Sequence, residues 1–385
     1  MIAFLGTTSL PALAVSSTST RPQLGSTEAA SYTIAKYMAK AGTLGSLTTD
    51  NWDPTGGVGA ISGFSANYKV ASDGSATYKT VQAAINAAVS AGGSTRKYIS
   101  VKAGTYTEVV CVPASAPPIT LYGLTGTAGD TVIVYNNANL TPKSTGTATS
   151  ACAGNASSAT IGTAGSATVT VLSASFNARN LTFKNSYVEG TYSGSNQSAL
   201  ALSIRGDKAI LENVSIIGNQ DTLYIGASSY TTVIRAFFKS SLIQGDTDFI
   251  FGHGTAAFYG CTIQYTGARL GSGTASYIFA PSTRPANSYG FLVISSTLSY
   301  TGSVASNSIY LGRAWDEGVG SLSNYVNGTS PNGQIVIRDT SIGAHIRLTA
   351  PWYKSTVGRP YCSSGCTYSA NRFQEYDNSG TGSGN

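Results

Sequence analysis

The sequence is poor in charge, histidine and proline. Of its 385 residues, 10% are Asp, Glu, Lys or Arg, 12 are prolines, and two are histidines, His253 and His345. Such sparse charge argues against a disordered chain and against a coiled coil, which needs charged flanking positions. Two histidines, with no G-x-S-x-G motif, leave little for a histidine-based triad, so we expect both to be structural.

Long apolar runs are also absent. No stretch of eighteen apolar residues occurs, so no segment is expected to span a membrane. Residues 1–20 resemble a signal peptide that lacks its basic start, with Ala12-Leu13-Ala14 as a cleavage site. We therefore expect secretion, or a location in the periplasm or cell envelope.

The cations form no patch. The net charge is +6, but the basic residues are scattered singly, so no arm or stripe indicates a nucleic-acid partner. A diffuse positive field suits a soluble polyanion such as an acidic polysaccharide. From charge alone, a merely basic surface is the simpler interpretation.

The five cysteines are odd in number. Cys362 and Cys366 are close enough to close a tight loop, and Cys111 and Cys152 flank a polar segment that a disulfide would close. In an oxidising compartment this second bridge stabilises by about 4 kcal/mol on the chain-entropy model. Cys261 lies in the apolar run FYGCTIQY and is predicted to be a buried free thiol. With no C-x-x-C pair and no Cys/His cluster, no metal or cofactor is predicted.

What the chain does contain is glycine and short β-rich runs. There are 44 glycines, a content typical of all-β chains with many turns. Two segments are predicted to be helical: residues 26–41, and residues 80–93 with Thr80 as N-cap and Gly92-Gly93 as the stop. After residue 98, runs such as ITLYG, NLTFKN and YGFLVISSTLSY recur.

Several of these runs share one shape, in which a small polar residue separates an apolar stretch from an alternating one. These marker residues are Asn180, Asn213, Ser241, Cys261, Thr297 and Thr340, at spacings of 33, 28, 20, 36 and 43. A solenoid of stacked parallel strands accepts variable spacing, because excess residues leave each coil as loops. A stacked antiparallel sandwich is the structural rival, but the tight hairpin turns that it needs are scarce.

We therefore predict an all-β fold, a single-stranded right-handed parallel β-helix. Helix 80–93 should cap its N-terminal end, and long loops should form a substrate cleft. The expected parts are a signal peptide (1–20), an irregular or helical lead-in (21–67), the β-helix (68–377) and a flexible tail (378–385).

Two carboxylates coincide in this repeat. Asp221 follows the marker Asn213 by eight residues, and Asp248 follows the marker Ser241 by seven. Stacked coils repeat at about 4.8 Å, so these carboxyls should be near neighbours. Close carboxylates push their pKa values apart, which makes one an acid and the other a base or nucleophile. A pair of turn aspartates capping backbone amides fits the spacing equally well.

A second pair of residues lies in YLGRAW. Arg313 is able to clamp a carboxylate with two parallel hydrogen bonds, and an exposed Trp315 would form a platform for a sugar ring. Alone, this pattern fits a loop arginine beside a buried tryptophan better.

Four motifs together are more informative. They are Gly104-Thr-Tyr106-Thr-Glu108, Gln220-Asp221-Thr222, Asp248-Phe-Ile-Phe-Gly252 and Leu311-Gly-Arg313-Ala-Trp315. In these motifs and their order the chain resembles pectin methylesterases, carbohydrate esterases with a right-handed parallel β-helix. The resemblance extends from Tyr68 to Tyr376, and the lead-in is similar to a bacterial, envelope-associated branch.

The resemblance implies hydrolysis of galacturonate methyl esters in pectin, by a monomer without a cofactor. Asp248 matches the family nucleophile, and Asp221 matches the general acid/base. Gln220 and Gln197 match the pair that stabilises the oxyanion. Arg313 matches the residue that orients the nucleophile. Such covalent catalysis requires neither histidine nor metal.

The chain also departs from the family pattern. Trp315 and Phe251 match the aromatic contacts in the substrate cleft, but Ala314 replaces the usual proline after the arginine. Asp246 adds a charge that is expected to raise the pKa of Asp248. Ser241 stands where several bacterial relatives have a cysteine that pairs with the counterpart of Cys261.

Three alternatives remain open at this stage. One is an esterase or thioesterase of the same scaffold that acts on short oligogalacturonides or on another acyl group. A second is a non-catalytic solenoid that binds acidic glycans. A polysaccharide lyase, which would also use a β-helix, is disfavoured because no cluster of calcium-binding acids is visible.

Overall fold

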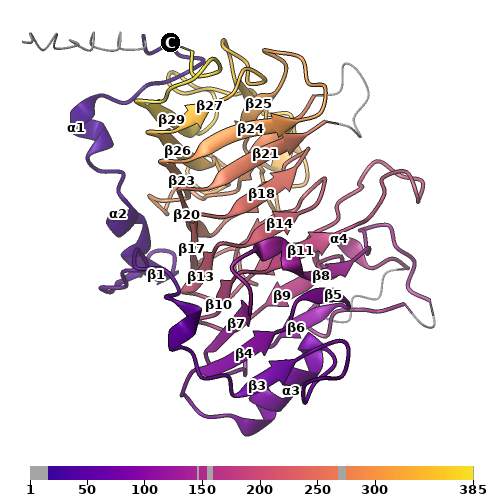
Figure 1. Cartoon of the computed structure of the whole chain (residues 1–385). Coiled ribbons are helices and arrows are strands. Elements are labelled where there is room, and N and C mark those ends of the chain that lie inside the picture. Colours follow the sequence, from indigo (N-terminus) through magenta and orange to yellow (C-terminus); the bar gives the residue numbers. More distant parts are fainter. Residues whose placement is uncertain (1–15, 145–146, 154–158, 268–274, 385) are drawn as a thin grey trace, which may run out of the picture.

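The chain is wound into coils that each add one strand to three parallel sheets (Figure 1). The structure is a computed structural model that describes residues 16–144, 147–153, 159–267 and 275–384. The parallel β-helix predicted from the repeat is therefore confirmed. The predicted cleavage site within residues 1–20 lies outside the described residues.

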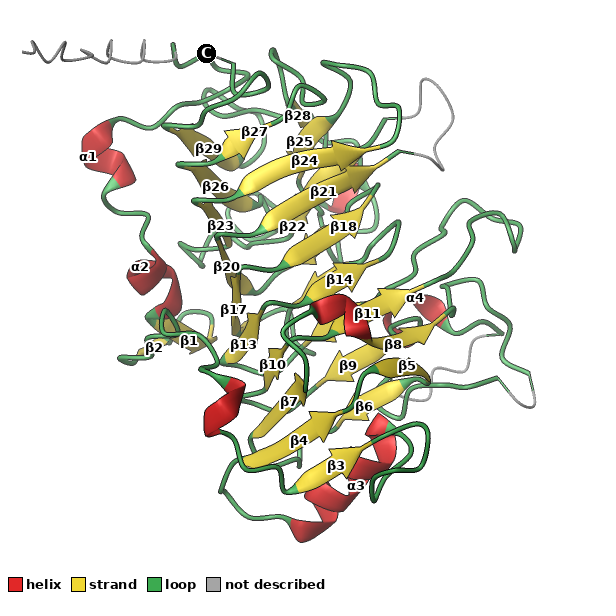
Figure 2. Ribbon diagram, viewed as in Figure 1, coloured by secondary structure: helices red, strands yellow, loops and turns green. Residues whose placement is uncertain are grey.

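The three sheets have the following strands in spatial order (Figure 2). The first contains β3 (Tyr68–Val70), β4 (Lys97–Val101), β7 (Ile119–Gly123), β10 (Asn177–Arg179), β13 (Ala209–Glu212), β17 (Arg235–Lys239), β20 (Thr255–Tyr259), β23 (Phe291–Ile294), β26 (Gln334–Arg338) and β29 (Arg372–Tyr376). The second contains β5 (Gly104–Thr107), β8 (Thr131–Tyr135), β11 (Thr182–Asn185), β14 (Ser215–Ile217), β18 (Leu242–Gly245), β21 (Thr262–Thr266), β24 (Thr297–Thr301) and β27 (Ser341–Ile342). The third contains β6 (Val110–Val112), β9 (Val169–Val171), β12 (Leu202–Ile204), β15 (Leu223–Ile225), β19 (Ile250–Gly252), β22 (Tyr277–Pro281), β25 (Tyr310–Arg313) and β28 (Trp352–Tyr353).

The core consists of apolar side chains stacked in register along the helix axis. In the first sheet, one such row is Leu121, Ala178, Leu211, Phe238, Phe258, Val293 and Ile337. All of these side chains are fully buried. Each coil therefore buries its apolar face against its neighbours, which is how a solenoid obtains a continuous core.

The marker residues predicted from the sequence do lie at one turn of each coil. In the later coils, however, the predicted marker is displaced from the left-handed residue of that turn. Asn180 and Asn213 have left-handed φ angles of 56° and 50° at the turn between the first and second sheets. Asn213 also donates a hydrogen bond from Nδ2 to Oδ1 of Asn180, at 2.8 Å. In later coils the left-handed position is held by Ser240, Gly260, Ser295 and Asp339. The markers Ser241, Cys261, Thr297 and Thr340 therefore follow the turn by one or two residues, because several small polar residues lie side by side there.

The N-terminal end of the core is covered by a helix, as predicted. Helix α3 (Val81–Ala91) begins after Thr80, whose hydroxyl accepts a hydrogen bond from the amide of Ala83 at 3.2 Å. Val81, Ala84, Ile85 and Ala88 are buried against the first coil. The cap keeps water from the open end of the apolar stack.

The helix predicted over residues 26–41 is wrong. The chain forms α1 (Ser26–Ala29), α2 (Ile34–Met38) and then strand β1 (Lys40–Thr43), which pairs with β2 (Thr48–Thr49) and β16 (Thr232–Val233). Tertiary packing overrides helix propensity, because Tyr37 and Met38 bury themselves on the outer face of the first sheet. Figure 1 shows this lead-in running along that sheet. It is thus part of the fold.

The tail expected to be flexible is also packed. The amide of Ser379 donates to the carbonyl of Thr340, and that of Gly382 donates to the carbonyl of Ile342, both at 2.9 Å. Asn378 and Ser383 are buried. Residues 378–384 extend the last coil and use backbone hydrogen bonds that a composition rich in Gly and Ser does not reveal.

The remaining short elements lie in loops. They are α4 (Gly162–Gly165) and 3₁₀ turns at Ile61–Gly63, Ala128–Asp130 and Leu322–Asn324. Disulfides join Cys111 to Cys152 and Cys362 to Cys366, while Cys261 is a buried free thiol. No helix in the described part of the chain is long and apolar enough to cross a membrane.

Candidate active site

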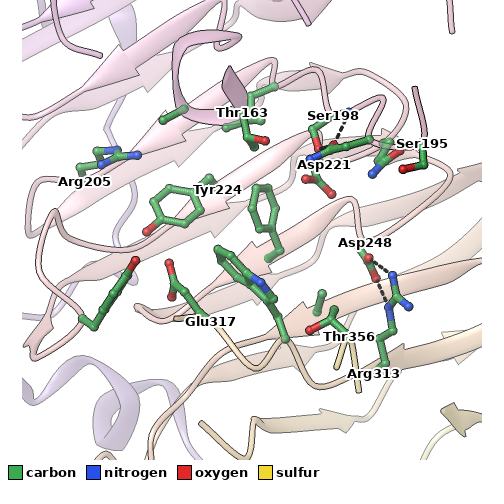
Figure 3. Close-up of a pocket in the computed structure, with 18 residues that line it drawn as sticks. Thr163, Ser195, Ser198, Arg205, Asp221, Tyr224, Asp248, Arg313, Glu317 and Thr356 are labelled. Carbon is green, nitrogen blue, oxygen red and sulfur yellow. Dashed lines mark hydrogen bonds and ion pairs between the residues drawn. The ribbon is translucent and has the colours of Figure 1, made fainter. Parts of the chain in front are cut away.

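A cavity of about 660 Å³ opens on the outer face of the third sheet. Figure 3 shows Asp221, Asp248 and Arg313 at one end, with Arg205, Tyr224 and Glu317 toward the other. Strands β15, β19 and β25 carry the central residues or lie directly beside them. The site therefore combines side chains from several successive coils.

The two predicted aspartates occupy the same place on adjacent coils. Pairing of Leu223 with Ile250 sets Asp221 opposite Asp248, and the amide of Asp221 donates to the carbonyl of Thr247 at 3.0 Å. Both aspartates have left-handed φ angles, 60° and 47°, which Asp tolerates better than most residues. This shared turn aims both carboxyls into the cavity.

Arg313 fixes the orientation of Asp248. Its Nε lies 3.0 Å from Oδ1 of Asp248, and Nη2 lies 2.5 Å from Oδ2. The guanidinium also stacks on the ring of Tyr277, with its carbon 4.1 Å from the ring centroid. Two parallel bonds hold the side-chain oxygens of Asp248 in one plane.

The second aspartate, Asp221, has a raised pKa. Burial, followed by the neighbouring Asp248 carboxylate, raises the pKa of Asp221 to about 8. A hydrogen bond from Ser198 and the charge of Arg313 oppose that rise without cancelling it. At neutral pH Asp221 therefore offers a protonated carboxyl beside Asp248, which Arg313 clamps.

Asp246, the additional acid noted in the sequence, lies in the electrostatic environment of Asp221. It is fully buried, and its pKa is raised to about 8 by burial, with a smaller contribution from the charge of Asp221. Its backbone carbonyl accepts from the hydroxyl of Ser276 at 2.6 Å. Asp246 is thus electrostatically coupled to Asp221.

We expect Asp246→Asn to stabilise the protein at neutral pH. A carboxyl whose pKa is raised on folding contributes stability below its unfolded pKa, and this is lost as pH rises through the folded pKa. The variant should therefore gain a few kcal/mol in unfolding free energy at about pH 7.5, and little at about pH 4. Urea unfolding at both pH values tests this, with Asp53→Asn at an exposed turn as control. A variant no more stable than the parent at the higher pH would contradict the assignment.

Gln220 lines the cavity, but Gln197 does not. The Gln197 side chain is buried in its own loop, where Oε1 accepts from the hydroxyl of Tyr187 at 2.6 Å and Nε2 donates to the carbonyl of Gly194 at 2.6 Å. Its neighbours Asn196 and Ser198 face the cavity instead. The role expected for Gln197 is therefore not supported, because residues alternate in direction along an extended segment.

Aromatic rings form the wall between the two ends of the cavity. Phe251 and Trp315 are in contact, with centroids 5.4 Å apart, and Tyr224 packs edge-on against Phe251 at 5.2 Å. Phe251 and Trp315 were expected there from the sequence, whereas Tyr224 was not. The position of Tyr224 could have been inferred from the stacking of the coils, since Tyr224 pairs directly with Phe251 on the next strand.

The opposite end of the cavity holds charges that the sequence did not reveal. The carboxylate of Glu317 lies 2.8 Å from Nδ1 of His253. The guanidinium of Arg205 covers the ring of Tyr224, with its carbon 5.0 Å from the centroid. Arg205 and Glu317 both face the cavity, which thus offers ionic and hydrogen-bonding groups at both ends. Glu317 lies two residues after Trp315, and this closeness in sequence could have indicated that Glu317 also faces the cavity.

The histidines fit structural roles. His253 pairs with Glu317, and His345 is buried beside Tyr265, where burial lowers its pKa to about 4. Among the residues that the structure describes, no group of three or more His, Cys, Asp or Glu side chains is placed to hold a metal ion.

Comparison with known proteins identifies the family. The sequence model of the pectinesterase family matches residues 67–159 and 136–321. A pectinesterase from Ralstonia solanacearum is 70% identical over 386 aligned positions, covering 100% of this chain and 97% of that protein. The structure of rice weevil pectin methyl esterase is 35% identical, with a TM-score of 0.81, covering 95% of this chain and 98% of that one. A pectin methylesterase D178A mutant, solved in complex with a hexasaccharide, is 29% identical with a TM-score of 0.66, covering 83% and 90%.

The matched region includes Asp221, Asp248 and Arg313, the residues that meet in the cavity. The identity to the bacterial relative extends over the whole chain, lead-in included. By sequence, fold and site, the chain belongs to the pectinesterase family.

Proposed function

We propose that this enzyme hydrolyses galacturonate methyl esters of homogalacturonan, with Asp248 as nucleophile and Asp221 as general acid/base. The supporting observation is the asymmetric carboxyl pair, in which Arg313 clamps Asp248 while burial raises the pKa of Asp221. An arginine-clamped carboxyl group beside a carboxyl group of raised pKa can supply a nucleophile and a proton donor.

In the first step, an oxygen of Asp248 attacks the ester carbonyl carbon, and the carbonyl oxygen becomes an oxyanion. Gln220 lines the cavity, and in this proposal its side-chain amide donates a hydrogen bond to the oxyanion. Asp221 gives its proton to the departing methoxide as the C–O bond breaks. The products are methanol and an acyl-enzyme anhydride on Asp248.

In the second step, the Asp221 carboxylate takes a proton from water. The hydroxide attacks the galacturonyl carbon of the anhydride, and the electron pair returns to Asp248. Arg313 then holds the regenerated carboxylate in its starting plane. The galacturonic acid product gives its proton to solvent and leaves as galacturonate, and both aspartates recover their original protonation states.

The direct test is methanol release from highly methylated pectin, beside a panel of aryl esters and thioesters. Release from pectin with negligible activity on the panel is the expected result. Preferred turnover of a thioester or aryl ester would replace the galacturonate substrate with another acyl group. We also propose that the enzyme is secreted. Its polymeric substrate lies outside the cell, and its two disulfides persist in an oxidising compartment.

Gln220 and Gln197 should respond differently to substitution. Gln220→Ala removes a donor that faces the reacting group, so kcat should fall by about 10²–10³ with little change in the melting temperature. Gln197→Ala breaks a buried loop network, so it should lower the melting temperature and affect kcat less. Kinetics and thermal unfolding of both variants test this. Equal kcat losses at unchanged melting temperature would restore Gln197 to the oxyanion site.

A further inference from the structure

Two tyrosines, Tyr277 and Tyr310, continue the row of Asp221 and Asp248 beyond the cavity, and the ring of a third, Tyr353, packs against Tyr310. The strand register sets Asp248 beside Tyr277, which pairs with Tyr310, and the amide of Asp248 donates to the carbonyl of Tyr277 at 2.8 Å. Tyr353 lies on the next coil, in register with Arg313. We call Tyr277, Tyr310 and Tyr353 the tyrosine ladder.

The rings of the ladder pack against one another. The rings of Tyr277 and Tyr310 are stacked with their centroids 5.6 Å apart. The ring centroid of Tyr353 lies 4.6 Å from that of Tyr310. Tyr277 is buried beneath Arg313, while Tyr310 and Tyr353 remain partly exposed. The ladder thus presents aromatic surface that begins at the residue clamping the nucleophile.

Cations accompany each ring. Arg313 covers Tyr277, Arg347 covers Tyr310 with its guanidinium carbon 4.7 Å from the centroid, and the Lys354 ammonium lies 5.8 Å from the Tyr353 centroid. Within the part of the chain that the structure describes, neither Arg347 nor Lys354 forms an ion pair with a protein carboxylate. The ladder therefore carries a positive charge next to the site.

We propose that the tyrosine ladder binds further units of the same galacturonan chain after it leaves the cavity, preferring units with free carboxylates. This inference rests on the proposed function. Sugar rings stack on aromatic faces, and Lys354 and Arg347 would attract the uronate charges of de-esterified units. Tyr310 is two coils from Asp248, roughly 10 Å at a strand spacing of about 4.8 Å, so a short oligomer held in the cavity would not reach the far rings.

The consequence is a preference for polymer over oligomer. A chain that spans both the cavity and the ladder gains contacts that a trimer lacks, so the ladder should lower KM for pectin and leave kcat unchanged. The decrease in KM should be largest for partly de-esterified pectin at low salt, because salt screens the attraction between exposed Lys354 and the uronate charges.

The test compares the double variant Tyr353→Ala/Lys354→Ala with the parent enzyme. Two assays are used: kcat/KM on methylated pectin against a methylated trigalacturonate, and direct binding to fully de-esterified polygalacturonate. Loss of one ring and one cation should weaken polygalacturonate binding by about tenfold and reduce kcat/KM on pectin to a similar extent. The trimer should be affected much less. Tyr353→Phe, which keeps the ring, should lose little.

Tyr259→Ala is the matched control, since Tyr259 is an exposed tyrosine on β20 in the first sheet. Equal losses on polymer and trimer would show that the rings only support Arg313, and an unchanged double variant would remove the ladder from binding altogether. If the parent enzyme released no methanol from any galacturonate ester, the proposed function would fail. Weakened polygalacturonate binding in the double variant would still support the ladder in that case.

Discussion

Asp248→Asn is expected to reduce methanol release from pectin by at least about 10⁴-fold. The neutral amide cannot form the acyl-enzyme, so the reaction loses its covalent route. Removing the nucleophile from a catalytic group that acts as a unit abolishes most of the rate enhancement. Initial rates of methanol release, with chelator present and absent, measure this loss.

The same substitution leaves Arg313 without its anion. In the parent enzyme the guanidinium is partly buried and clamps Asp248 with two hydrogen bonds. Loss of this pair could destabilise the fold, so the thermal unfolding of the variant must be measured beside its kinetics. Arg313→Lys is a useful companion variant, because it retains the charge but not the planar, two-point contact. It should retain part of the activity. If folded Asp248→Asn released methanol at near-parental rates, the nucleophile would have to be another group.

Asp221→Asn should lower kcat by about 10²–10⁴-fold, because the leaving methoxide would depart without a proton. In the parent enzyme, kcat/KM should fall as pH rises through about 8, where Asp221 loses the proton that it must donate. Activity is thus present below the raised pKa and lost above it. The profile between roughly pH 5 and pH 10 checks this sign.

A better leaving group separates the two aspartates. A galacturonate ester of a more acidic alcohol needs less help from a proton donor, so Asp221→Asn should recover much of its first-step rate on that ester. Asp248→Asn should recover none. Equal defects of both variants on both esters would mean that Asp221 does not protonate the leaving group. A parent enzyme whose activity did not decline on the alkaline side would remove Asp221 from the acid role.

Some of this site follows from sequence pattern alone. The eight-residue offset of Asp221 from Asn213 recurs between Ser240 and Asp248, since these two coils leave the turn and enter the third sheet after the same number of residues. The marker at Ser241 was one residue late, but the stacked carboxyls were still predicted, because an error of one position in the turn barely alters which coils are adjacent.

The sequence-based expectations that differ from the structure concern features that depend on tertiary contacts. The helix predicted over 26–41 is broken because Tyr37 and Met38 bind the outer face of the first sheet. The Gln197 amide turns into its own loop because Tyr187 and the backbone around it satisfy its hydrogen bonds. Neither partner is visible in local periodicity.

The sequence by itself determined the stacked-coil architecture, the capping helix α3 and the identity of the two aspartates, because these depend on repeats and local turn chemistry. Only the tertiary structure supplies a physical basis for the proposed assignment of Asp248 as nucleophile and Asp221 as acid. That assignment depends on the reach of Arg313 from two coils beyond Asp248 and on the burial of Asp221. Asp246 is electrostatically coupled to Asp221, which the order of residues did not reveal either. Distance and desolvation set these pKa values, and neither can be read from the order of residues.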